Sequence, residues 1–183
     1  MATGRGGMSV TERSASQEFD RFRVWCKTPR AGAPLVKDYF PSLYQFLKYS
    51  RDPDTARSLA ISAFKSTKEL EALRDNYCSF RSMLFAQALS LLKQDGGIAP
   101  RITHRPWEPS SAHVTNSTVS RRHRKGLRAL KELPHEDALV VRLYRFHGLS
   151  LQELADVFQI TINEVNSQLR QSWKRMNDHV HRI

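Results

Sequence analysis

Apolar residues recur at helical spacing in the C-terminal third of the chain. The first run of this kind holds five residues: Leu139, Val140, Leu143, Tyr144 and Phe146. Side chains three and four positions apart share one face of a helix, so the run predicts a helix that begins at Pro134. Gly148 follows the run and is expected to end the helix, because glycine enters the left-handed region without steric cost.

Two capping boxes predict two further helices. Ser150 and Glu153 open the first, whose apolar face is Leu151, Leu154 and Ala155. Thr161 and Glu164 open the second, whose apolar stripe is Val165, Leu169, Ser172, Trp173 and Met176. In each box the hydroxyl and the carboxylate satisfy backbone N–H groups that the first helical turn leaves unpaired.

A short helix, an apolar turn and a longer helix with a polar outer face are typical of a helix-turn-helix. The outer positions predicted to contact DNA are Thr161, Asn163, Glu164, Asn166, Ser167, Gln168, Arg170, Gln171 and Lys174. Asn, Gln and Arg can pair with base edges, and cations can meet phosphates. The same polar face also fits the solvated surface of an ordinary three-helix unit, so both interpretations stay open.

The N-terminal half carries a second series of amphipathic segments. We expect a short helix or an ordered arm around Phe19–Trp25 and helices at 35–50, 55–68 and 77–93. The segment 28–34 separates the segment around Phe19–Trp25 from the helix at 35–50. Asp52 or Asp54 is expected to cap the helix that follows the Asp-Pro turn. The charged stretch 69–76 continues or links the flanking helices.

These patterns predict an all-α fold of two small helical domains joined by a flexible linker. Residues 1–16 are small and polar and are expected to be disordered, and residues 17–93 form the first domain. Residues 94–120 are rich in Gly, Pro and Ser and form the linker. Residues 121–183 form the helix-turn-helix domain.

The formal net charge of +11 and the sequence pI of about 10.1 favour a polyanionic partner. A membrane surface or ribosomal RNA would fit the charge equally well. A basic run opens the C-terminal domain, and we expect three of its residues to contact phosphates: Arg122, Arg124 and Lys125.

Several functional classes find no support in the sequence. Cys26 and Cys78 form no CxxC pair, so a disulfide framework is not expected. The seven histidines show no metal-ligand spacing, and there is no P-loop or nucleophile–base set, so we expect no metal, no cofactor and no enzyme. No apolar run approaches the roughly 20 residues that span a bilayer, and no signal peptide is evident, so we expect a cytoplasmic protein without membrane contact.

The C-terminal pattern resembles region 4 of bacterial sigma factors, most closely the small extracytoplasmic-function (ECF) type. The resemblance rests on Leu133-Pro134, Gly148-Leu149-Ser150, Glu153-Leu154-Ala155, Ile160-Thr161 and Val165. It implies a domain that reads the −35 promoter element and touches the flap of RNA polymerase. Other helix-turn-helix regulators share parts of this pattern.

The N-terminal half resembles sigma region 2 more weakly. Tyr44 to Leu47, Asp52-Pro53, Phe64 and the segment Phe80 to Leu84 fall in matching order. In the family a Phe-Arg-x-Trp-Leu segment helps to melt and read the −10 element, and an acidic patch docks on the clamp helices of the polymerase core. Here Met83 replaces the Trp, and the stretch Thr55-Ala56-Arg57-Ser58 stands where the acidic patch is expected, with hydroxyl residues at Thr55 and Ser58 and a cation at Arg57.

The loss of this acidic patch suggests a mode of control. Hydroxyl residues stand where the acids are expected, and phosphorylation by a Ser/Thr kinase would restore negative charge at the start of a helix. The positions assigned to polymerase binding and to modification are Thr55, Arg57, Ser58 and Ser62.

The sequence therefore predicts an ECF-type sigma factor whose partners are RNA polymerase core, promoter DNA and either an anti-sigma factor or a kinase. One alternative is a helix-turn-helix transcriptional regulator that binds DNA without joining polymerase. Another is a sigma mimic that binds an anti-sigma protein and does not itself support initiation.

Overall fold

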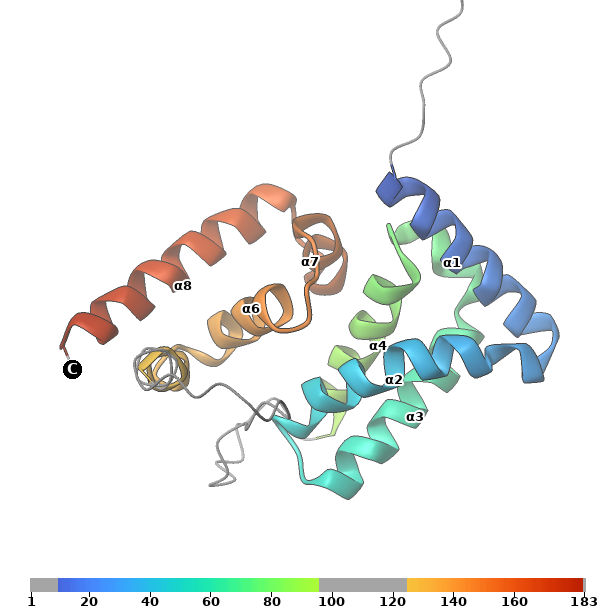
Figure 1. Cartoon of the computed structure of the whole chain (residues 1–183), viewed down its shortest axis with the longest axis horizontal. Helices are drawn as coiled ribbons and strands as arrows, with labels where there is room; N and C mark the ends of the chain where they lie inside the picture. Colours follow the sequence, from blue (N-terminus) through green and yellow to red (C-terminus); the bar gives the residue numbers. More distant parts are fainter. Residues whose placement is uncertain (1–9, 96–124, 183) are drawn as a thin grey trace, which may run out of the picture.

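The computed structural model describes residues 10–95 and 125–182 (Figure 1). Over these residues every regular element is helical, so the predicted all-α fold is confirmed. The N-terminal unit, residues 10–95, contains α1 (Val10–Lys27), η1 (Pro29–Gly32), α2 (Ala33–Lys48), α3 (Pro53–Glu69), η2 (Glu71–Asn76) and α4 (Phe80–Gln94). The C-terminal unit, residues 125–182, contains a helical segment at 125–131, then α6 (His135–Arg145), α7 (Leu151–Phe158) and α8 (Ile162–Arg182).

Helix α4 is the centre of the N-terminal unit, and α1, α2 and α3 pack against it. Its side chains at Phe80, Met83 and Leu84 are fully buried. The Phe80 ring lies 5.1 Å from the ring of Phe22 in α1, in the range where aromatic pairs add to the stability gained from burial. Apolar residues lie on nearly every face of α4, and neighbouring helices cover it on several sides.

The predicted caps and turns of the N-terminal unit are largely present. The Asp52 carboxylate accepts from the Thr55 N–H at 3.0 Å and caps α3, with Pro53 at its first position. The segment 28–34 does interrupt the chain, as η1 followed directly by α2. Gly32 fits here because a Cβ at this position would lie 2.1 Å from the Trp25 indole nitrogen.

Two helices begin several residues away from their predicted starts. Helix α1 begins at Val10, within the segment expected to be disordered. Helix α4 begins at Phe80 rather than at 77, because Ser79 and Ser82 form a capping box that fixes the first turn. The part of the linker from residue 96 to 120 lies outside the described residues.

The C-terminal unit packs α6, α7 and α8 around one apolar core. Four residues of the predicted stripe of α8, Val165, Leu169, Ser172 and Met176, are at most 9 % exposed, and the fifth, Trp173, is half-buried. Leu139, Val140 and Leu143 of α6 are also buried, but Tyr144 and Phe146 are 40 % and 42 % exposed. These two residues of the predicted apolar run therefore lie outside the core, Tyr144 within α6 and Phe146 directly after its last residue, Arg145.

The two units pack against each other. The sequence had predicted two domains joined by a flexible linker and gave no indication of this contact. Helix α7 lies between the N-terminal end of α8 and the side of α4 (Figure 1), and α4 and α7 are in contact. The first helix of the helix-turn-helix therefore faces the N-terminal unit.

Candidate DNA-binding helix and its surroundings

The start of α8 is fixed by the predicted capping box. The Glu164 carboxylate accepts from the Thr161 N–H at 2.7 Å, and the Thr161 hydroxyl accepts from the Glu164 N–H at 3.2 Å. These hydrogen bonds lower the pKa of the exposed Glu164 carboxyl below its ordinary value. Thr161 and Glu164 are exposed but already engaged with each other, so their first role is to hold the end of the helix.

The turn before α8 depends on a left-handed residue. Gln159 directly follows the last residue of α7, Phe158, and its φ is 55°. The Ile160 N–H donates to the Ala155 carbonyl at 3.1 Å, which closes the turn. This turn leads the chain from α7 into α8, and the apolar turn residues Phe158 and Ile160 pack against the core.

The outer face of α8 is polar and largely open to solvent. Its exposed or half-buried residues are Asn163, Asn166, Ser167, Arg170, Gln171 and Lys174. Amide and guanidinium groups on one face of a helix that follows a tight turn provide the donors and acceptors needed to pair with base edges in a major groove.

Gln168, which was predicted to contact DNA, points toward α6 instead. The half-buried Gln168 amide donates to the Asp137 carboxylate of α6 at 3.4 Å. Asp137 is 8 % exposed and also forms an ion pair with Arg175. Gln168 and Arg175 therefore tie α8 to α6, because a buried carboxylate needs donors around it.

The other predicted positions are distributed over the molecule. Lys125 is half-buried, while Arg122 and Arg124 lie outside the described residues. On α3, Arg57 and Ser58 are exposed, and Thr55 and Ser62 are half-buried. The structure does not bring these α3 residues into one site with α8.

A set of contacts between α4 and α7 was not foreseen. Glu153 of α7 is 6 % exposed and receives Arg81 of α4 through two hydrogen bonds, Nε to Oε1 at 2.9 Å and Nη2 to Oε2 at 2.5 Å. The Ser79 hydroxyl donates to the same carboxylate at 2.7 Å. Burial by itself would raise the pKa of Glu153, but the donors from Arg81, Ser150 and Ser79 hold that pKa below its ordinary value.

Asp156, one turn along α7, makes a second contact with the same end of α4. One of its oxygens accepts from the Cys78 N–H at 2.6 Å and from the Ser82 hydroxyl at 3.0 Å. Burial, with the neighbouring Asp156, raises the pKa of the Cys78 thiol to about 12, so the thiol stays neutral. Both acids of α7 thus serve as acceptors for the start of α4.

The loop after α6 adds a third contact. His147 lies between the rings of Phe46 and Phe85, with centroid distances of 5.8 and 5.6 Å. Its Nδ1 is 3.0 Å from the Ser42 hydroxyl. The Arg142 guanidinium lies over the Tyr49 ring, 2.9 Å from its centroid.

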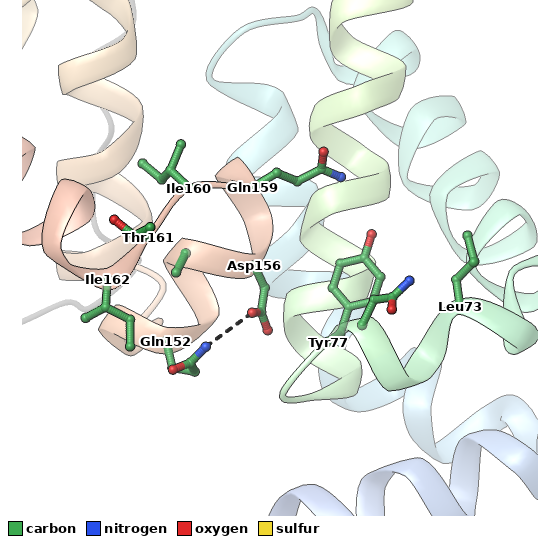
Figure 2. Close-up of a pocket in the computed structure, with 10 residues that line it drawn as sticks. Leu73, Tyr77, Gln152, Asp156, Gln159, Ile160, Thr161 and Ile162 are labelled. Atoms are coloured by element: carbon green, nitrogen blue, oxygen red, sulfur yellow. Dashed lines mark hydrogen bonds between the residues drawn. The ribbon is translucent and has the colours of Figure 1, made fainter.

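A groove opens beside these contacts, between η2 and the helix-turn-helix (Figure 2). Its volume is about 530 Å³. One wall carries Leu73, Asn76 and Tyr77, and the other includes Gln152, Asp156, Gln159 and the first residues of α8, Thr161 and Ile162. The beginning of α8 therefore faces the N-terminal unit across this groove.

No sequence signal pairs these residues across the two units. Glu153 is visible in the sequence as a capping residue, and Arg81 as part of the Phe-Arg segment, but they are 72 positions apart.

Over the described ranges, no cluster of His, Cys, Asp or Glu side chains is arranged to hold a metal ion. In the same part of the chain, no helix has the length and apolar character required to cross a membrane.

Residues 123–176 match the family model described as Sigma-70, region 4. The match includes α6, α7 and most of α8, so the helix-turn-helix is similar to the promoter-reading domain of sigma factors. It supports interaction with promoter DNA and with RNA polymerase core. No curated protein matches the chain.

Proposed function

We propose that this protein is an ECF-type sigma factor that directs RNA polymerase to specific promoters. The observation that carries the proposal is the polar outer face of α8, which lies within the residues that match Sigma-70, region 4. The side chains of Asn163, Asn166, Ser167, Arg170 and Gln171 would read the −35 element, and Lys174 would contact phosphate.

The N-terminal unit would supply the second contact with polymerase. Its helices follow the order expected of sigma region 2, with the Asp52-capped turn leading into α3 and the Phe80–Leu84 segment opening α4. The exposed side of α3 is cationic at Arg57 instead of acidic, so docking on the clamp helices requires a change in charge.

Phosphorylation of Ser58 would supply that change. Ser58 is exposed on the second turn of α3, and a phosphate there adds a charge of about −1.5 to −2 near the positive end of the helix. Thr55 is less suitable because it is half-buried and lies directly against the Asp52 carboxylate, which would repel a phosphate. Of the two hydroxyls, Ser58 is the position we favour.

Run-off transcription with purified core polymerase tests the initiation function. The full chain, unmodified and with Ser58→Asp, is added to core polymerase and a library of promoter fragments. We expect specific transcripts, and stronger core binding by Ser58→Asp than by Ser90→Asp, which makes the same change at an exposed position of α4. The absence of both core binding and transcripts from all forms would exclude a sigma factor.

The second candidate is a helix-turn-helix regulator or a sigma mimic that does not support initiation. The cationic Arg57 in place of an acid favours it, since this side chain would oppose docking on the usual polymerase surface. Sequence-specific DNA binding without core binding would identify a regulator, and binding to an anti-sigma protein without transcripts would identify a mimic.

A further inference from the structure

The groove between η2 and the helix-turn-helix combines one carboxylate with exposed apolar side chains (Figure 2). We propose that this groove binds a small organic cation, an ammonium group on an apolar body. The ammonium group would lie against Asp156, and the apolar body would lie between Leu73 and Ile162. The outer face of α8 is not part of this site, so binding of the cation requires neither DNA nor RNA polymerase.

Asp156 supplies the charge of the groove. Its Oδ2 atom is engaged by α4, because the Cys78 N–H and the Ser82 hydroxyl both donate to it, at 2.6 and 3.0 Å. From the described part of the chain, its Oδ1 atom accepts one long hydrogen bond, 3.5 Å, from the Gln152 amide (Figure 2). Since an ionised carboxylate has about four acceptor sites, Oδ1 can also accept from a ligand.

The other polar groups of the lining decide the sign of the ligand's charge. Among the described residues that line the groove, Asp156 is the only charged one. An anion would therefore be repelled by this carboxylate, with no cation in the same lining to offset the repulsion. The amides of Asn76, Gln152 and Gln159 can donate or accept, and they suit a ligand of any charge. A cation gains most, because a charge-assisted hydrogen bond is roughly twice as strong as a neutral one.

Two exposed apolar side chains line opposite walls of the groove. Leu73 of η2 is 45 % exposed, and Ile162, the first residue of α8, is 42 % exposed. Ile162 continues the buried stripe of Val165 and Leu169 at helical spacing, beyond the part of the stripe that the core covers. An apolar ligand body between the walls would remove this surface from water, which favours binding.

The two walls are held in a fixed relation before any ligand binds. Asp156 joins α7 to the start of α4, and Glu153 of the same helix binds Arg81. Buried residues of both units also belong to one apolar core cluster. The volume of about 530 Å³ lies within the range of small-molecule sites, roughly 300–1,000 Å³, which are usually preformed and often lie at domain interfaces. Ordering the groove therefore costs little when the ligand binds.

The test uses the full chain and three probes that share a phenyl group on a short stem. At neutral pH phenethylamine is a cation, phenethyl alcohol is uncharged and hydrocinnamate is an anion. Heteronuclear NMR titrations follow the side-chain amides of Asn76, Gln152 and Gln159, which line the groove. We expect phenethylamine to shift these signals with an affinity at least tenfold higher than that of the alcohol, and hydrocinnamate to give no saturable shift.

Substitutions locate the site on the protein. Leu73→Ala removes an apolar side chain from one wall, and Ile61→Ala is its matched control, because Ile61 is 44 % exposed on α3 outside the groove. Asp156→Asn removes the charge but leaves one oxygen for the Cys78 N–H and the Ser82 hydroxyl. We expect the affinity for phenethylamine to fall at least threefold in Leu73→Ala and at least tenfold in Asp156→Asn, and to stay unchanged in Ile61→Ala.

Several results would overturn the cation site. Equal affinity for the amine and the alcohol would do so, as would saturable binding of hydrocinnamate or the absence of amide shifts with millimolar phenethylamine. Binding that Leu73→Ala leaves unchanged would place the amine elsewhere on the protein, even if Asp156→Asn failed to fold. Each measurement is made without DNA and without polymerase, so failure of this site is distinguishable from failure of the proposed function.

Discussion

The carboxylate of Glu153 closes the first turn of its own helix and also binds Arg81 of the other unit. It accepts from the Ser150 N–H at 2.8 Å and receives the Arg81 guanidinium through bonds of 2.9 and 2.5 Å. Because the box already orients this carboxylate, little side-chain entropy remains to be lost when Arg81 docks. A local helix signal thus prepares a long-range contact.

A double-mutant cycle with Arg81→Ala and Glu153→Gln should reveal strong coupling. Hydrogen bonds to charged groups contribute more than neutral ones, so we expect a coupling free energy of about 2 kcal/mol. Urea unfolding of the wild type, the two single variants and the double variant provides the measurement. A coupling below about 0.5 kcal/mol, the usual limit for independent sites, would contradict a direct interaction.

Stability should fall between pH 7 and pH 5 because of His147. Burial, reinforced by the charge of Arg142, lowers its pKa from 6.5 to about 4. The unfolded chain therefore takes up a proton over a range where the folded chain does not, and the free energy of unfolding drops by about 2 kcal/mol on acidification.

The control for this pH effect is His147→Phe, which keeps an aromatic ring between Phe46 and Phe85 but cannot titrate. Its unfolding free energy, from urea titrations at both pH values, should depend less on pH. The remaining slope includes His135, whose pKa burial also lowers. Equal slopes in wild type and variant would rule out His147 as the cause.

Replacing Gly32 by alanine should destabilise the N-terminal unit. The new Cβ would lie 2.1–2.6 Å from three atoms of the Trp25 indole, so the ring or the turn must shift, at about 1–3 kcal/mol. Thermal unfolding followed by Trp fluorescence measures the loss. Gly126→Ala is the comparison, since a Cβ there meets nothing within 4 Å. This substitution also replaces glycine, a poor helix former, by alanine. A Gly32→Ala protein as stable as Gly126→Ala would show that this close approach is not required.

Substitutions of two polar residues of α8, Arg170 and Gln168, should distinguish an effect on DNA binding from an effect on stability. Arg170→Ala should weaken DNA binding by about 1–3 kcal/mol if it reads a base, with stability unchanged, because its side chain is exposed. Gln168→Ala should instead lower stability, because the amide supports the buried Asp137. Titrations against an enriched duplex at two salt concentrations, beside urea unfolding, distinguish the two effects. The reverse pattern would mean that a different face of α8 meets DNA.

Much of each unit could be predicted from residues close together in the sequence. The boxes at Ser150 and Thr161, the cap at Asp52 and the buried stripe of α8 are all as expected. Such features depend on hydrogen bonds and periodicity within three or four positions, where the chain has few alternatives. The exposure of Tyr144 and Phe146 could not be predicted from their spacing, because it depends on which sides of α6 the neighbouring helices cover.

The sequence by itself determined that the chain is helical, that it holds a helix-turn-helix and, apart from Gln168, which polar residues lie on the outer face of α8. Only the tertiary structure decided that Gln168 turns inward to Asp137 and that α7 lies against α4. Those outcomes join groups as many as 78 positions apart, as Cys78 and Asp156 are. Periodicity indicates which side of a helix is covered, but the identity of the covering partner depends on how whole helices pack, which no local pattern encodes.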